Sequence, residues 1–217
     1  AGAGAALRED VERVTCPVVL IDRLTQCGWC DAVGFDNYLG GRLAAQYLLE
    51  GGHKRIGIVT GDVAESSAAD RRRGFVDAIE QAGERFDPAL CVSGDYRFDG
   101  GYHAADRIID GGATAVFCCN DVMALGFRQR MAERGLHVTE DMQVIGYDNI
   151  LRRFGLGLRM TTVEQSVVDL AAAGWGMLGS RIDAVVRGDG DSGAGRPWLA
   201  SPQVKVLTPK LVQAACA

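Results

Sequence analysis

Side chains that form hydrogen bonds stand at the ends of several short apolar runs in this 217-residue chain. They are Asp22, Asp95 with Tyr96, Asn120, and Asp148. In an open α/β sheet, ligands bind outside the carboxyl ends of the strands, so we expect these side chains to meet. Carboxylates and amides bond to hydroxyl groups, and an aromatic ring covers the apolar face of a sugar. The pattern therefore favours a neutral polyol as the ligand.

Aspartate and asparagine after a strand also serve as turn formers or helix caps. We expect Asp121 to cap the helix that begins there, which leaves Asn120 and Asp148 as the better ligand candidates. Arg71, near the start of a predicted helix, is a further candidate, because a guanidinium group can clamp adjacent hydroxyls or a carboxylate. The two arginines that follow it read better as a solvated basic face.

The elements that must position these residues alternate along the chain. Apolar, β-branched runs predict strands over 16–22, 55–61, 89–95, 115–121, 142–148 and 202–207. Helical periodicity predicts helices over 39–51, 67–82, 100–110, 121–134 and 166–187. Most strand runs are continuously apolar, which is typical of strands covered on both faces. The order predicts an α/β fold with a doubly wound parallel sheet.

Composition narrows the class of protein. The net charge of -5 argues against direct DNA contact by this chain alone, because nucleic-acid binders are usually basic. No run of 18 apolar residues occurs, so we expect no membrane span. The seven cysteines are odd in number and scattered, which argues against a disulfide framework and favours a reducing cytoplasm.

Signatures of catalysis and cofactor binding are missing from the sequence. It contains no H-E-x-x-H, G-x-S-x-G or phosphate-loop string. Cys27 and Cys30 form a C-x-x-C pair, but no second such pair and no histidine pair completes a zinc site. We therefore expect neither an enzyme nor a bound metal or cofactor.

Several strings, read together, resemble the effector-binding core of the lactose-repressor/galactose-repressor (LacI/GalR) family of transcriptional regulators. They occur in family order: PVVLIDR (17–23), DN (36–37), GGRLAAQYLLEGGHKRIGIVTG (40–61), RRRGFVDAIEQAG (71–83), TAVFCCNDVMALGF (114–127), RGLHVTEDMQVIGYDN (134–149) and TTVEQ (161–165). NDVMALG and VIGYDN are the most specific of them. The resemblance covers roughly residues 15–212.

The resemblance implies a periplasmic-binding-protein-like fold, in which two similar α/β subdomains surround an effector cleft. Carried across by motif, the positions that line the cleft are Asp22, Arg71, Tyr96, Asn120, Asp148 and Gln165. Gln165 is indicated by the resemblance alone. The implied effector is a small polar molecule, most naturally a carbohydrate.

The resemblance also divides the chain. Residues 1–36 and 163–188 correspond to a remnant of the first subdomain, and 37–160 with 198–217 to the second. The helix-turn-helix, the hinge and the opening strands of the first subdomain are absent, so we expect an incomplete first subdomain with one obvious strand. Its unpaired edge invites association with another chain. Operator DNA would be contacted only through the missing amino-terminal domain.

The family resemblance implies a homodimer that partly uses the helix over 121–134. A stripe on that helix, formed by Met123, Phe127 and Met131, is either core or part of such an interface, and core packing is the default for apolar residues at this spacing.

Three functions can be weighed against these features of the sequence. The first is effector sensing in a cytoplasmic transcriptional repressor. The alternative is a periplasmic solute-binding protein that serves a transporter, against which the cysteines and the lack of an export signal count. An enzyme acting on sugars lacks a nucleophile and an acid/base pair.

Overall fold

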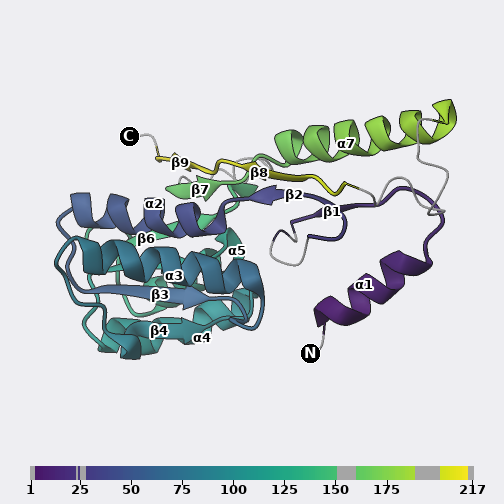
Figure 1. Cartoon of the computed structure of the whole chain (residues 1–217). Helices are drawn as coiled ribbons and strands as arrows, with labels where there is room; N and C mark the ends of the chain where they lie inside the picture. Colours follow the sequence, from purple (N-terminus) through teal and green to yellow (C-terminus); the bar gives the residue numbers. More distant parts are fainter. Residues whose placement is uncertain (1–2, 23, 25–27, 151–159, 189–200, 215–217) are drawn as a thin grey trace. The chain divides into compact units, whose positions relative to one another are not determined.

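The computed structural model describes the chain except for residues 1–2, 23, 25–27, 151–159, 189–200 and 215–217. Contacts divide the chain into two compact units (Figure 1). The first unit comprises Ala1–Phe35 and Ser166–Leu207, and the second comprises Asp36–Gln165 and Thr208–Ala217. None of the helices in the described part has the length and apolarity needed to cross a bilayer.

The second unit is built on a six-stranded sheet of order β4-β3-β5-β6-β7-β9. Its strands are β3 (Ile56–Thr60), β4 (Cys91–Ser93), β5 (Ala115–Cys118), β6 (Gln143–Tyr147), β7 (Thr162–Glu164) and β9 (Lys210–Val212). All neighbours run parallel except β9, which pairs antiparallel with β7. The predicted parallel α/β sheet is therefore confirmed.

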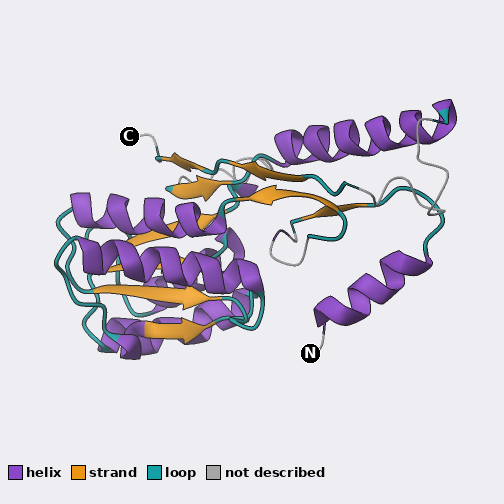
Figure 2. Cartoon of the chain, viewed as in Figure 1, coloured by secondary structure: helices purple, strands orange, loops and turns teal. Residues whose placement is uncertain are grey.

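Helices are packed in pairs against this sheet. They are α2 (Asn37–Glu50), α3 (Ser66–Gln81), α4 (Phe98–Asp110) and α5 (Asp121–Glu133), with a short 3-10 turn at Pro88–Leu90. Helix α2 contacts α3, and α4 contacts α5. Every residue of β3 and β5 is buried, as continuous apolar runs covered on both faces require. Figure 2 shows this layered arrangement of helices and strands.

The core of the second unit includes the apolar stripe on α5. Met123, Phe127 and Met131 are all fully buried in it. Core packing is thus the correct interpretation of the stripe, and these three side chains are not available to an interface.

The first unit contains a three-stranded parallel sheet of order β1-β2-β8. Its strands are β1 (Val19–Ile21), β2 (Asp31–Phe35) and β8 (Val204–Leu207), and its helices are α1 (Ala3–Arg13) and α7 (Val167–Arg187). Helix α7 packs on β1 and β2. An ion pair also joins α7 to β2: the guanidinium of Arg181 donates to both carboxylate oxygens of Asp31, at 2.6 and 2.8 Å.

Two expectations about this unit were wrong. The strand over 204–207 was assigned to the second subdomain, but it pairs with β2 and belongs to the first unit. The first unit has three strands where one was expected, because β2 and β8 join β1. Strands β7 and β9, in the second unit, were not predicted.

Candidate ligand-binding site

Polar side chains gather where the parallel strands of the second unit end. Strands β3 to β7 point the same way, so their carboxyl ends lie at one edge of the sheet. The residues that connect there come from the helices α2 and α3 and from the ends of β4, β5, β6 and β7 or the loops that follow them. We call them the Arg71 cluster: Asn37, Arg71, Tyr96, Asn120, Tyr147, Asp148 and Gln165.

Arg71 is the centre of the cluster. It lies on α3 and is only 4% exposed. Its Nε donates to Oδ1 of Asn37 at 2.8 Å, and its Nη1 donates to the carbonyl oxygen of Cys119 at 2.7 Å. The guanidinium carbon lies 3.8 Å from the ring centre of Tyr147 and 5.9 Å from that of Tyr96. A buried guanidinium is thus held by two neutral acceptors and two aromatic faces.

The surroundings keep Arg71 charged. Burial acts to lower its pKa, but the electrostatic effects of Tyr147, Asp148 and Tyr96 raise the pKa above its ordinary value overall. In return, the pKa of Tyr147 is raised well above its usual range, chiefly by burial. The cluster therefore presents a positive group, with Asp148 close enough to act on it electrostatically.

Tyr147 is held in place by hydrogen bonds with Gln165 and Asn37. Nε2 of Gln165 donates to the hydroxyl of Tyr147 and to Oδ1 of Asn37, both at 3.2 Å. The Tyr147 hydroxyl donates to the same Asn37 oxygen at 3.4 Å. Residue 40 must be glycine here, because a Cβ would lie 2.3 Å from the Tyr147 hydroxyl. Gln165, which only the resemblance indicated, therefore lies in the cluster.

Asn120 joins the cluster through Tyr96, while also capping α5. Its Oδ1 accepts from the backbone N–H of Met123 at 2.8 Å, and its Nδ2 donates to the carbonyl of Tyr96 at 3.0 Å. The expectation that Asp121 would be the cap was wrong. Asp121 is fully buried, and its carboxylate accepts from the Thr162 hydroxyl at 2.8 Å and from a backbone N–H.

Tyr96 carries the one unsatisfied hydroxyl found among the buried side chains of the described residues. Its oxygen has no hydrogen-bond partner there, although Ser67 lies close enough to affect the pKa of Tyr96, which burial raises. The ring occupies the space left by Gly61, where a Cβ would lie 2.0 Å from it. Buried polar atoms are nearly always paired, so this hydroxyl is suited to a ligand or a water molecule.

The backbone at these strand ends is unusual. Asp95 and Tyr96 have φ values of 50° and 58°, and Asp148 and Asn149 have 96° and 57°. Non-glycine residues rarely adopt positive φ, and each instance costs about 1–3 kcal/mol. Such residues concentrate at functional sites, so the geometry supports a binding role for this edge of the sheet.

Five of the six predicted site residues lie in the cluster: Arg71, Tyr96, Asn120, Asp148 and Gln165. The sixth, Asp22, lies in the first unit, where it follows β1 with φ 58° and its backbone N–H donates to Val33. Sequence reasoning missed Asn37 and Tyr147. Both stand in strings that carried the family resemblance, DN and VIGYDN, but neither was considered as a site residue.

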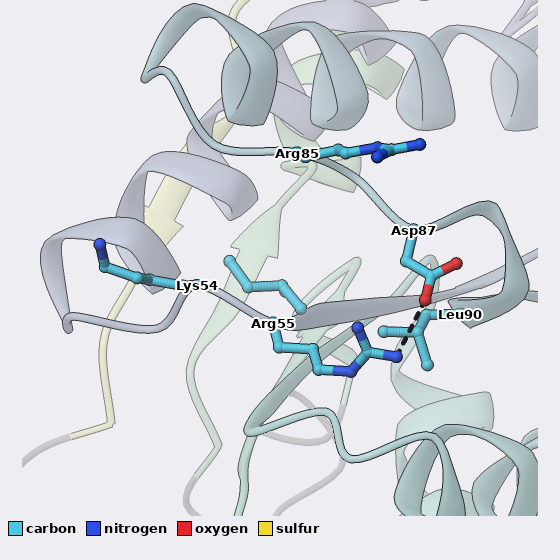
Figure 3. A pocket seen from close by; sticks show the side chains of 6 residues that line it. Lys54, Arg55, Arg85, Asp87 and Leu90 are labelled. Carbon is cyan, nitrogen blue, oxygen red and sulfur yellow. Dashed lines mark hydrogen bonds and ion pairs between the residues drawn. The ribbon is translucent and has the colours of Figure 1, made fainter.

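A hollow of about 130 Å³ lies away from the Arg71 cluster, at the start of β3 (Figure 3). Its charged lining consists of Lys54, Arg55, Arg85 and Asp87. Most of these charges are already paired: Arg55 donates to Asp87 at 2.9 Å, and Lys54 lies 3.0 Å from Glu84. Exposed ion pairs of this kind contribute little to stability. Because most charges of this hollow already pair with other side chains, it is a weaker candidate for a ligand site than the Arg71 cluster.

A parallel α/β unit with hydrogen-bonding groups at the carboxyl ends of its strands has the architecture in which open α/β sheets bind small molecules. Comparison with known families agrees. Residues 45–205 match the family model described as the periplasmic binding protein-like domain. The chain belongs to this family.

Curated relatives include transcriptional repressors. The chain is 38% identical over 169 residues to the HTH-type transcriptional repressor PurR of Pasteurella multocida, which covers 77% of this chain and 51% of that protein. It is 36% identical over 170 residues to PurR of Haemophilus influenzae, covering 77% and 50%. The chain thus spans about half the length of the curated relatives it matches.

Solved structures show the same fold. A LacI family regulator from Enterococcus faecium with bound ribose superposes with a TM-score of 0.82 and 25% identity, covering 98% of this chain and 74% of that one. The regulator CelR in complex with cellobiose gives 0.75 and 26%, covering 97% and 69%.

Proposed function

We propose that this chain is the effector-sensing part of a LacI-type transcriptional repressor and that the Arg71 cluster contacts a carbohydrate effector. The observation that carries the proposal is the buried guanidinium of Arg71, held at the carboxyl ends of parallel strands. A charged group is costly to bury, and a ligand oxygen compensates for part of that cost.

Each member of the cluster has a distinct part in this proposal. Arg71 donates to adjacent hydroxyls, and Asp148 accepts from a hydroxyl. Asn120 keeps one amide hydrogen beyond its bond to Tyr96, and the Tyr96 hydroxyl is unsatisfied within the described structure. These groups bind a polyol without transforming it, so we propose a sensor and not an enzyme.

The whole protein extends this proposal. Its effector would shift the population between two arrangements of the two units, which act as the subdomains of the sensor, and so change operator binding. Operator contact would come from a helix-turn-helix domain, as the names of the relatives suggest, in a cytoplasmic homodimer. A transport-linked solute-binding protein shares the fold, but the relatives are regulators, which favours the sensor.

The test is titration calorimetry on the whole natural protein, with D-ribose and cellobiose as first probes and a wider sugar panel after them. Arg71→Ala and Asp148→Asn should each weaken binding at least tenfold, because a hydrogen bond to a charged group contributes about 1.5–3 kcal/mol. Arg55→Ala is the matched control, since it removes an arginine from the hollow at the start of β3 and should leave affinity unchanged.

Circular dichroism establishes that each variant is folded, and Asp148→Asn keeps the shape of the side chain should Arg71→Ala unfold. Wild-type affinity in both Arg71→Ala and Asp148→Asn would show that the ligand lies elsewhere. Chemical turnover of a bound sugar would show that the protein is an enzyme.

A further inference from the structure

Two members of the Arg71 cluster stand next to two of the three points where the chain passes between its units. The first passage lies between Phe35 and Asp36, and the second between Gln165 and Ser166. Asn37 is the second residue after the first passage, and Gln165 is the last before the second. The hydrogen bond from Nε2 of Gln165 to Oδ1 of Asn37 therefore ties the two passages together.

The same oxygen of Asn37 also holds Arg71. It accepts from Nε of Arg71 at 2.8 Å, from Nε2 of Gln165 at 3.2 Å and from the Tyr147 hydroxyl at 3.4 Å. The Nε of arginine carries a single hydrogen, so this bond sets the plane of the guanidinium. One amide oxygen thus receives donors from α3, from β6 and from the segment after β7.

A capping role does not explain this asparagine. Helix α2 is capped by the preceding residue, Asp36, whose carboxylate accepts from the backbone N–H of Leu39 at 2.8 Å. The side chain of Asn37 is therefore not needed to begin the helix, and the bonds given above direct its oxygen to Arg71.

We propose that Asn37 is a positioning residue that orients the Arg71 guanidinium and links it to these two of the three passages between the units. The link works in both directions, because a ligand that pulls on Arg71 also pulls on Asn37 and hence on Gln165. This second part rests on the proposed function, whereas the orientation of Arg71 does not.

The test needs no ligand. In ¹⁵N NMR of the 217-residue chain, the Nε–H of Arg71 should exchange slowly with water, because the group is buried and bonded. Asn37→Ala should speed that exchange at least tenfold. Asn37→Asp should keep it slow, because a carboxylate oxygen accepts the same three donors.

Asn149→Ala is the matched control. It removes another buried asparagine of the second unit, whose Nδ2 donates to Glu164 at 3.0 Å. Its positive φ makes alanine unfavourable, so this variant loses stability without touching Arg71. Slow exchange in Asn149→Ala together with fast exchange in Asn37→Ala supports the proposal. Unchanged exchange in Asn37→Ala, or equal acceleration in both variants, would overturn it.

Two further measurements keep the proposal testable. If Asn37→Ala does not fold, Asn37→Ser shortens the side chain and should give the same acceleration. Backbone ¹⁵N relaxation at residues 35–36 and 165–166 should show increased motion in Asn37→Ala, and wild-type relaxation there would remove the link to the passages. Sugars that fail to bind the wild-type protein would refute the proposed function while leaving the exchange result valid.

Discussion

Replacing Gly74 by alanine should destabilise the second unit, although alanine is the better helix former. Gly74 lies on α3 where that helix meets α2, and a Cβ there would lie 2.0 Å from the carbonyl oxygen of Tyr38. Gly41 on α2 makes the reciprocal contact, since its Cβ would lie 2.0 Å from the carbonyl oxygen of Arg71. The two helices therefore touch backbone to backbone.

The size of the effect follows from this contact. A carbon normally stays about 3.3 Å from a carbonyl oxygen. Because the Cβ of alanine at position 74 would start 2.0 Å from the Tyr38 oxygen, the two helices would have to move apart by about 1.3 Å more. The obstacle is backbone, which cannot rotate away as a side chain does. Overpacking costs about 1–3 kcal/mol, and the upper end applies here. Alanine returns about 1 kcal/mol of helix propensity, which leaves a net loss of about 2 kcal/mol.

Gly176→Ala on α7 provides the contrast, because no atom lies within 4 Å of a Cβ there. This variant should gain up to about 1 kcal/mol. Hydrogen exchange followed by mass spectrometry reports on α3 and α7 separately, so the effects on the two units can be compared. Protection should fall in α3 for Gly74→Ala and rise in α7 for Gly176→Ala. Stabilisation of α3 by Gly74→Ala would show that the helices are not in backbone contact.

Three other expectations follow, one for the first unit and two for the buried thiol of Cys119. Asp31→Ala removes the carboxylate partner of Arg181 and should lower the free energy of unfolding of the first unit by about 3 kcal/mol. The loss should appear as reduced amide protection in α7, with protection in α3 unchanged. Burial is the main cause that raises the pKa of Cys119 to about 12, with Arg71 opposing it. At pH 8 about one molecule in ten thousand carries that thiolate, so a disulfide reagent should modify exposed Cys16 and spare Cys119 in the native protein. Because the thiol pKa is higher in the folded state, this group's contribution to stability should be lost between about pH 9 and pH 12, and denaturant midpoints measure that loss.

The order of β3 to β6 and of the helices between them was predictable because these strands lie in continuous apolar runs, whereas the short strands β7 and β9 lie outside such runs. Strand β2 was not predictable in this way. All five of its residues are buried, but Asp31 interrupts the apolar pattern and is buried only because Arg181 pairs with it. Gly34 interrupts it again, because the side chain of Leu24 occupies the space that a Cβ would take. Both causes depend on residues that are distant along the chain or outside the strand.

The candidate site was predictable to a similar degree. Strand-end logic located Tyr96, Asn120 and Asp148, because the carboxyl ends of parallel strands share an edge. It chose Asp121 over Asn120 as the helix cap, and this choice was wrong, because both residues are good caps and their types alone do not separate them. The outcome depends on Thr162, whose hydroxyl binds Asp121 from 41 residues away.

The choice of partners around Arg71 bears on why a charged group is buried here at all. Its two hydrogen bonds to described residues go to an amide oxygen and a backbone carbonyl, and they use Nε and Nη1. Neutral acceptors orient the guanidinium without neutralising it. A bidentate carboxylate would instead occupy one whole edge of the group, as Asp31 does for Arg181. Arg71 therefore keeps its charge and part of its donor capacity, as its proposed contact with a ligand requires and as a purely structural ion pair would not.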